Sequence, residues 1–144
     1  MERLGLEIIR LNNLISRNIS NLETISLLNE ISNSNGFILR YIEEHEDEVI
    51  TQKDIEKAFS ITRSTSSTVL SLMEKKELIV REVLKEDNRV KKVLITDKGK
   101  KINSDIKKEI DQFELNLIKG FNDEELKQFL FYIDKLKENL KEEK

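Results

Sequence analysis

The chain has 144 residues, of which 37% are charged and 38% hydrophobic, and a net charge of −3. This hydrophobic content is too high for a disordered chain, and no apolar run approaches the roughly 18 residues of a transmembrane helix. The absence of cysteine and the single histidine exclude disulfides, cysteine zinc sites and a multi-histidine metal site. With no proline and only four glycines, we expect a soluble, cytoplasmic, mainly α-helical domain with short turns.

Charge is distributed unevenly along the chain. Residues 49–101 hold 13 Lys and Arg against 8 Asp and Glu, a net charge of +5, whereas residues 1–48 and 102–144 carry −5 and −3. A basic middle between acidic ends is typical of a local binding surface for a polyanion. Chance segregation on a solvated surface is an equally open interpretation of this pattern alone.

The N-terminal third predicts three helical segments. Hydrophobic residues three or four positions apart over residues 4–22 indicate a long amphipathic helix, and residues 25–31 indicate a short one. The polar stretch Ser32–Gly36 predicts a loop. The helix after it would end in the acidic run Glu43–Glu48, and its apolar residues are Phe37, Ile38, Tyr41 and Ile42.

A helix-start signal opens the basic middle. Thr51 can cap a helix with Asp54 as its capping-box partner, and Ile50 and Ile55 are spaced for the apolar contact that fixes such a start. This helix would end near Phe59.

A second helix is predicted only a few residues later, from the N-cap candidate Thr62 to about Lys76. So short a turn between two helices is what a helix-turn-helix requires. Away from its apolar face this helix carries one cation and a series of hydroxyl groups, namely Arg63, Ser64, Thr65, Ser67, Thr68 and Ser71. Such a face, together with Thr62 at the capped N-terminus, suits contacts with phosphates and base edges, and a weak helix held by tertiary packing is the alternative.

Two runs rich in β-branched residues, Leu78–Leu84 and Val90–Ile95, flank the polar tip Lys85–Arg89 and predict a β-hairpin. A helix-turn-helix followed directly by a hairpin is the winged-helix arrangement. Its second helix enters the major groove of DNA, and its hairpin reaches phosphates or the minor groove. An ordinary polar hairpin tip is the alternative for Lys85–Arg89.

The C-terminal third predicts two more helices. Thr96–Gly99 would turn the chain into a long helix that Gly120 ends, and Asn122 would begin the last helix in a capping box with Glu125. The apolar stripes of the first and last helices exceed what one winged helix needs. They are the predicted dimerisation residues: Leu4, Ile8, Leu11, Ile15, Leu126, Phe129, Ile133, Leu136 and Leu140.

A series of short motifs runs through the middle of the chain: Ile50–Ile55, Ile61–Thr65, Leu72–Lys76, Asp87–Arg89 and Leu94–Gly99. The most specific part is the last pair, an Asp-x-Arg hairpin tip followed by Leu-x-Thr-x-x-Gly. Together these motifs resemble the MarR family of bacterial transcriptional regulators. The resemblance covers roughly residues 36–102 by motif and the whole chain by helix order and length.

The resemblance implies a single domain that is mainly α with a small β-hairpin wing. Residues of about 36–101 would form the winged helix-turn-helix lobe, flanked by dimerisation helices in residues 1–35 and 102–144. Such a homodimer binds double-stranded DNA at a palindromic operator, most often as a repressor, and many members release DNA when a small, often phenolic, ligand binds. No cofactor is implied. The alternative is a winged-helix protein-interaction module or antirepressor without operator binding.

The family pattern also implies roles in the hairpin. Arg89 would enter the minor groove, with Asp87 bracing it, and three lysines would lie near phosphates, namely Lys85, Lys91 and Lys92.

Three departures from the family pattern bear on these roles. Glu77 stands where the family usually has glycine, so a turn is made without an easily left-handed residue. Thr68 stands where arginine is frequent, which leaves Arg63 as the only cation on the proximal reading face and limits bidentate readout of guanine. The absence of cysteine excludes sensing by thiol oxidation.

Other candidate residues have plainer interpretations. His45 invites a pH- or metal-sensor reading, but it lies among acidic residues, and a solvated helix end is favoured. Tyr41 and Phe37 suit a ligand pocket, but core packing is favoured for each. Because one histidine and no cysteine cannot assemble a nucleophile with its base, no enzymatic activity is expected.

Overall fold

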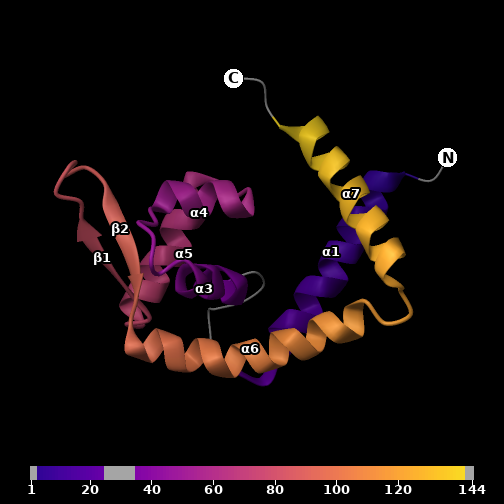
Figure 1. Cartoon of the computed structure of the whole chain (residues 1–144), viewed down its shortest axis with the longest axis horizontal. Helices are drawn as coiled ribbons and strands as arrows, with labels where there is room; N and C mark the ends of the chain where they lie inside the picture. The colour runs from indigo at the N-terminus through magenta and orange to yellow at the C-terminus, as the bar shows by residue number, and fades with distance from the viewer. Residues whose placement is uncertain (1–2, 25–34, 142–144) are drawn as a thin grey trace. The chain divides into compact units, whose positions relative to one another are not determined.

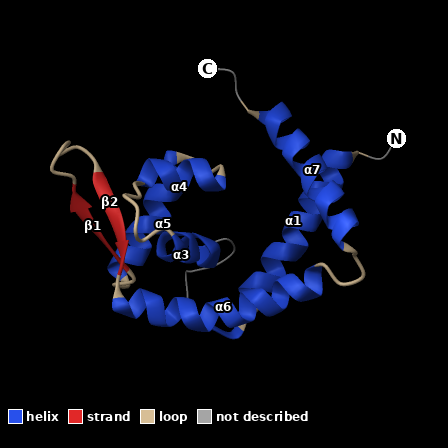
Figure 2. Ribbon diagram, in the orientation of Figure 1, coloured by secondary structure: helices blue, strands red, loops and turns tan. Residues whose placement is uncertain are grey.

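The computed structural model describes residues 3–24 and 35–141, and we label its elements as in Figure 1. The helices are α1 (Leu4–Ser20), α3 (Asn35–Glu44), α4 (Gln52–Phe59), α5 (Arg63–Lys75), α6 (Asp97–Leu117) and α7 (Asp123–Leu140). The strands β1 (Ile79–Val83) and β2 (Lys91–Ile95) stand between α5 and α6 in the chain. Figure 2 shows the helices and this one hairpin, which confirms the predicted fold class. The helix predicted at residues 25–31 lies outside the described residues.

The chain divides into two compact units, residues 1–110 and residues 111–144. The first unit contains α1, α3, α4, α5, the hairpin and most of α6, and the second contains the end of α6 and all of α7. In the described part of the chain, no helix is both long and apolar enough to cross a membrane.

The core of the first unit lies where α3, α4, α5 and the hairpin meet. The two strands are antiparallel, with Ile79 opposite Ile95 and Val83 opposite Lys91. The backbone before α4 joins them, because the Val93 N–H donates to the Ile50 carbonyl at 2.7 Å. The buried cluster consists of Ile38, Leu39, Ile42, Ile50, Ile55, Val69, Leu70, Met73, Leu78, Ile79 and Val93.

Side-chain caps fix both helix starts of the helix-turn-helix, as the sequence predicts. The Thr51 hydroxyl accepts from the Asp54 N–H, and the Asp54 carboxylate accepts from the Thr51 N–H at 2.8 Å, which completes the capping box of α4. The Thr62 hydroxyl accepts from the Thr65 N–H at 3.2 Å and caps α5. Between the two helices Ser60 takes a left-handed conformation with φ 53°, so the turn stays short.

Two glycines have roles that the sequence analysis mistook. The predicted loop at Ser32–Gly36 is wrong at its end, because α3 begins at Asn35 and Gly36 is buried in its first turn, while Ser32–Ser34 lie outside the described residues. Gly99 does not form a turn and lies in the first turn of α6. A Cβ there would stand 2.2 Å from the Leu78 carbonyl oxygen, so glycine is required by a close approach of backbones.

In the second unit, α7 begins at the predicted residue. The Asn122 side chain accepts from the Glu125 N–H at 2.8 Å. The Glu125 carboxylate accepts from the Asn122 side-chain amide at 2.9 Å. A complete capping box would instead have this carboxylate accept from the Asn122 backbone N–H. Gly120 follows the end of α6 with φ 91°, a conformation that suits glycine.

Candidate nucleic-acid interface

The face of α5 predicted to read DNA is mostly exposed in this chain. Ser67 is half-buried, and the exposed members of the predicted set are Thr62, Arg63, Ser64, Thr65, Thr68 and Ser71. Ser66 is fully buried against the rest of the lobe. The N-terminal half of α5 therefore presents neutral hydroxyl groups and the Arg63 guanidinium, beside N–H groups that a helix N-terminus directs outward.

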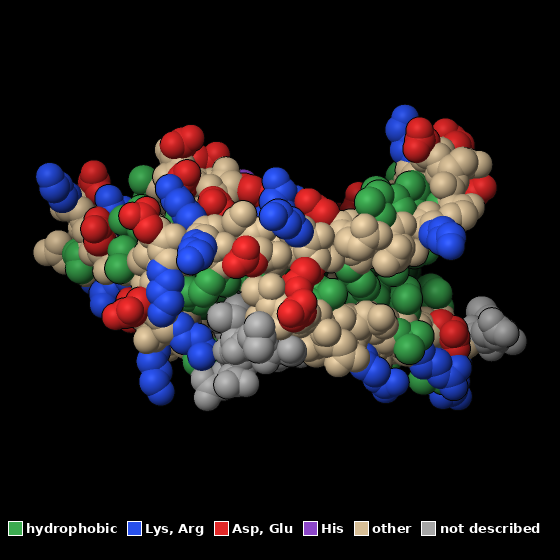
Figure 3. Space-filling model, turned by 90° about the horizontal axis from the view of Figure 1, so that it is seen from below, with side chains coloured by type: hydrophobic (Ala, Val, Ile, Leu, Met, Phe, Trp, Pro, Cys, Tyr) green, Lys and Arg blue, Asp and Glu red, His purple; other side chains and the backbone are tan. Residues whose placement is uncertain are grey.

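A groove of about 490 Å³ lies between α4, α5 and the hairpin. Its cationic side chains come from four elements and the hairpin tip, namely Lys53, Arg63, Arg81, Arg89 and Lys91. Glu56 is its acidic member. In Figure 3, Lys and Arg side chains are prominent on the side of the view where Figure 1 draws the hairpin. Such a convergence of cations beside a polar helix face provides a local attraction for phosphates although the chain as a whole is acidic.

At the hairpin tip, Asp87 holds both the backbone and the guanidinium of Arg89, including Nη2 at 3.5 Å. The Asp87 carboxylate accepts from the Arg89 backbone N–H at 3.0 Å and from Nε at 3.2 Å. These two bonds, the backbone one first, hold the pKa of Asp87 below its ordinary value. The Arg89 side chain is nevertheless 91% exposed, so its guanidinium remains accessible to solvent.

A bidentate ion pair joins the hairpin to the last turn of α5. Arg81 of β1 donates to the Glu74 carboxylate from Nε at 3.2 Å and from Nη2 at 3.1 Å. This pair lowers the pKa of Glu74, chiefly through the hydrogen bond and secondly, against partial burial, through the charge of Arg81. The hairpin and α5 are therefore held to each other by a contact of defined geometry.

The lysines predicted to approach phosphates are not equivalent. Lys91 lines the groove, whereas Lys92 stands on the opposite face of the strand and pairs with Glu82 at 3.5 Å. Lys85 is exposed at the hairpin tip and does not line the groove. The three lysines carry the same prediction because the sequence pattern does not show which face of a strand each one occupies.

Six residues that line the groove were not predicted to bind DNA, namely Gln52, Lys53, Glu56, Arg81, Thr51 and Val90. The first three lie on α4, which sequence reasoning treated only as a support for α5. Gln52 and Glu56 are four residues apart and so share a face of the helix, which is the signal that could have found them.

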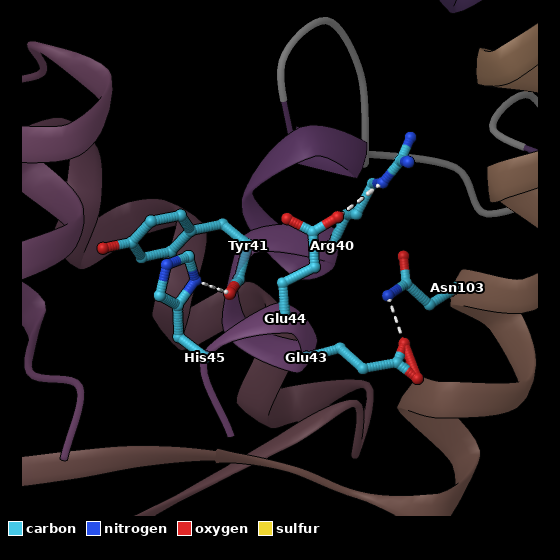
Figure 4. Close-up of polar contacts among 6 residues, drawn as sticks. All are labelled: Arg40, Tyr41, Glu43, Glu44, His45 and Asn103. Atoms are coloured by element: carbon cyan, nitrogen blue, oxygen red, sulfur yellow. Dashed lines mark hydrogen bonds and ion pairs between the residues drawn. The ribbon is translucent and has the colours of Figure 1, made fainter. Parts of the chain in front are cut away.

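Figure 4 draws Tyr41 and His45, two of the residues considered for a sensor or ligand role. Their rings lie 4.1 Å apart, and Tyr41 also meets Phe59 edge to face at 5.5 Å. His45 Nδ1 donates to the Tyr41 carbonyl at 2.8 Å. Tyr41 packs against the core cluster, as favoured above, and Phe37 is half-buried.

Figure 4 also shows Asn103 of α6, whose side chain donates to the Glu43 carboxylate at 2.7 Å. Asn103 is 3% exposed, and its Oδ1 has no hydrogen-bond partner among the described residues. Sequence reasoning did not single it out, because a lone asparagine in an amphipathic helix is usually on its polar face.

Hydrophobic side chains reach the surface of α1 and α7. The predicted dimerisation residues Leu4, Ile8, Leu11, Phe129 and Leu140 are exposed, and further exposed ones are Leu6, Ile9, Leu14, Leu130, Phe131 and Tyr132. Ile15, Leu126, Ile133 and Leu136 are half-buried, and α7 holds no fully buried residue. Figure 3 shows hydrophobic side chains at the surface among the charged ones.

Comparisons with known proteins agree with this geometry. Residues 27–89 match the sequence model of the MarR family. The structure of a S. aureus MepR–DNA complex matches with a TM-score of 0.79 at 28% identity, over 94% of each chain. S. aureus MepR in a DNA-binding conformation matches with a TM-score of 0.82 at 27% identity, over 97% of this chain and 100% of that one. MarR from Oenococcus oeni PSU-1 shares the fold, with a TM-score of 0.70 at 23% identity over 94% and 96% of the two chains. Residues 27–89 therefore carry the sequence pattern of the MarR family, and these matches support a DNA-binding transcriptional regulator with a winged-helix fold.

Proposed function

We propose that this regulator binds an inverted-repeat operator as a homodimer and represses transcription there. The observation that carries the proposal is the groove in which cations of α4, α5 and the hairpin converge beside the hydroxyl face of α5. In each protomer α5 would enter a major groove, and Arg89 would reach the adjacent minor groove.

The charge in the groove supports phosphate binding. Lys53, Arg63 and Lys91 form no ion pair among the described residues, and only Arg81 and Arg89 are engaged by carboxylates. Cations without acidic partners gain the most from neutralising phosphates, because binding releases the counterions of the DNA. S. aureus MepR, whose structure resembles this chain, has been solved in complex with DNA.

The apolar surfaces of α1 and α7 support the homodimer. Phe129, Leu130, Phe131 and Tyr132 are four consecutive hydrophobic residues, each between 47% and 63% exposed in the single chain. Consecutive residues face different sides of a helix, so large apolar side chains surround α7 here, which is typical of a helix that another protein chain covers. The proposal includes release of the operator by a small aromatic ligand, which rests on the family resemblance.

Binding measured on selected duplexes tests the proposal. Duplexes enriched from random sequence by the protein should contain an inverted repeat with half-site centres about 10 bp apart, roughly 34 Å. Affinity should fall steeply with salt, with a slope near −0.9 for each phosphate contact. Inserting about five base pairs at the dyad should abolish tight binding, because one half-site then faces away.

The alternative, a winged-helix interaction module without operator binding, is favoured by one feature. Arg63 is the only cation among the predicted reading residues of α5. If no sequence is enriched and the remaining binding is independent of salt, this alternative replaces the operator-binding proposal. If the protein binds the selected operator and the operator with the insertion at its dyad equally well, each lobe acts alone and the proposed dimeric binding is wrong.

A further inference from the structure

Four side chains of α4 and α5 form one hydrogen-bonded chain beside the groove. Glu56 Oε1 accepts from the Ser66 hydroxyl at 2.7 Å. Ser66 Oγ accepts from Gln52 Nε2 at 3.0 Å, and Ser67 Oγ accepts from the same nitrogen at 2.9 Å. This series of hydrogen bonds therefore runs from the Glu56 carboxylate, through the buried Ser66 hydroxyl and the Gln52 amide, to the Ser67 hydroxyl, which lines the groove.

The acceptors around Ser66 and Gln52 set the direction of these bonds. The Ser66 hydroxyl donates to the Glu56 carboxylate or to the Arg63 carbonyl at 3.0 Å, and in either case its lone pairs are offered to Gln52. Gln52 Nε2 is also 3.4 Å from Glu56 Oε1, which places the NH₂ group of the amide, and not its carbonyl, on this side. The two amide hydrogens then go to Ser66 and Ser67.

This direction gives Ser67 and Thr68 opposite polarity. Ser67 Oγ already accepts from Gln52, and its own hydrogen finds no acceptor among the described residues, so the groove meets a donor. The Thr68 hydroxyl donates to the Ser64 carbonyl at 3.1 Å, which leaves its exposed oxygen as an acceptor. Neighbouring hydroxyls on one helix thus differ in what they can bind.

We propose that Gln52 is a specificity-determining residue that acts through Ser67 without contacting a base. The inference rests on the proposed function, because it requires α5 to lie in the major groove. There a donor at Ser67 recognises acceptors of a base edge, such as N7 of a purine, O6 of guanine or O4 of thymine. An acceptor at Thr68 recognises the amino group of adenine or cytosine. Gln52 is a positioning residue in this scheme, and Glu56 fixes its amide.

The test compares variants by base discrimination, defined as the ratio of affinities for the selected operator and for operators with one changed base pair per half-site. Gln52→Met keeps the length of the side chain and removes the donor. Gln52→Met and Ser67→Ala should each lower discrimination about tenfold at the same base pair. The double variant should lose no more than either single one, because both remove the same directed contact.

Thr68→Ala provides the matched control, since Thr68 makes no hydrogen bond with Gln52 among the described residues. Its loss should fall at a different base pair and add to that of Gln52→Met.

Two results would overturn this inference and leave the proposed function in place. Gln52→Met could weaken binding to all sequences equally, or it could lower discrimination as much in the Ser67→Ala background as in the wild type. Either result would assign Gln52 to bracing α4 against α5. A wild-type protein that prefers no base at any position would overturn the proposed function and this inference together.

Discussion

Arg89 combines a guanidinium held by Asp87 with a side chain that is almost fully exposed. Asp87 holds its backbone N–H and Nε, yet 91% of the side chain is exposed. A cation presented in this way suits a narrow minor groove, where the negative potential of DNA is strongest.

We therefore expect Arg89→Ala to weaken binding to most duplexes, and most strongly to AT-rich ones. The slope of log affinity against log salt should become shallower by about 1, because one phosphate-neutralising cation is lost. Fluorescence anisotropy over a salt series measures both quantities. Lys127→Ala on α7 removes the same charge outside the groove and should leave the slope unchanged. An unaltered slope in Arg89→Ala would show that the hairpin tip does not contact DNA.

Glu77 is held in a left-handed conformation with φ 62°, where side chains other than glycine are strained. Its carbonyl accepts from the Thr96 hydroxyl at 2.6 Å, so the turn is tied to the end of the hairpin. Glu77→Gly should raise the free energy of unfolding by about 0.5–1 kcal/mol, since relief of strain exceeds the added flexibility of the unfolded chain. Urea unfolding measures the change. Lys76, the residue before Glu77, has φ −82° and is not strained, so Lys76→Gly should lower the free energy of unfolding.

At the scale of elements, helix starts could be predicted and close backbone contacts could not. Thr51, Thr62 and Asn122 begin their helices as the sequence indicates, because a cap depends on residues only three positions away. Gly99 depends on Leu78, which lies in another part of the chain, and was mistaken for a turn. For the same reason the hydroxyl face of α5 was foreseen, whereas the bonds of Gln52 across two helices and the Arg81–Glu74 pair were not.

The approach of α6 to the start of the hairpin gives a sharp stability prediction. In Gly99→Ala the new Cβ would meet the Leu78 carbonyl oxygen at 2.2 Å and Ile95 Cγ1 at 2.8 Å. Because backbone must move, we expect a loss of about 3 kcal/mol or more in the free energy of unfolding. Gly5→Ala is the matched control. Nothing lies within 4 Å of a Cβ there, so it should stabilise α1 by about 0.5–1 kcal/mol. Equal effects of the two substitutions on thermal unfolding would contradict the contact.

The ion pair between Arg81 and Glu74 should make stability depend on pH. The pKa of Glu74 is lowered from about 4.5, so its contribution is present above pH 4.5 and is lost as the pH falls through the lowered pKa. The difference in unfolding free energy between wild type and Glu74→Gln should therefore be constant near neutral pH. It should decrease towards zero in acid, where Glu74 is protonated. In an Arg81→Met background most of the difference should be lost, and the charge of Lys91 accounts for the small remainder. A difference of unchanged size there would locate the partner of Glu74 elsewhere.

For the whole molecule, the exposed aromatic segment of α7 is the feature that a single chain does not explain. Leu130→Lys places a charge on a residue that is 63% exposed, so it should cost the isolated chain little and should dissociate a dimer that buries it. Sedimentation at micromolar concentration should give twice the 16.9 kDa chain mass for wild type and a single mass for the variant. Val49→Lys, at 60% exposure outside α1 and α7, should remain a dimer. A monomeric wild type would refute the dimer.

The bidentate contact between Arg81 and Glu74 has a consequence for the geometry of operators. Because it joins the last turn of α5 to β1, one lobe sets a constant phase between the base pairs read by the helix and those reached by the hairpin. Each added base pair between these two segments rotates one of them by roughly 35° about the DNA axis. The AT-rich segment should accordingly lie at one invariant offset from the half-site core in every operator of this protein, however much the sequences in between differ.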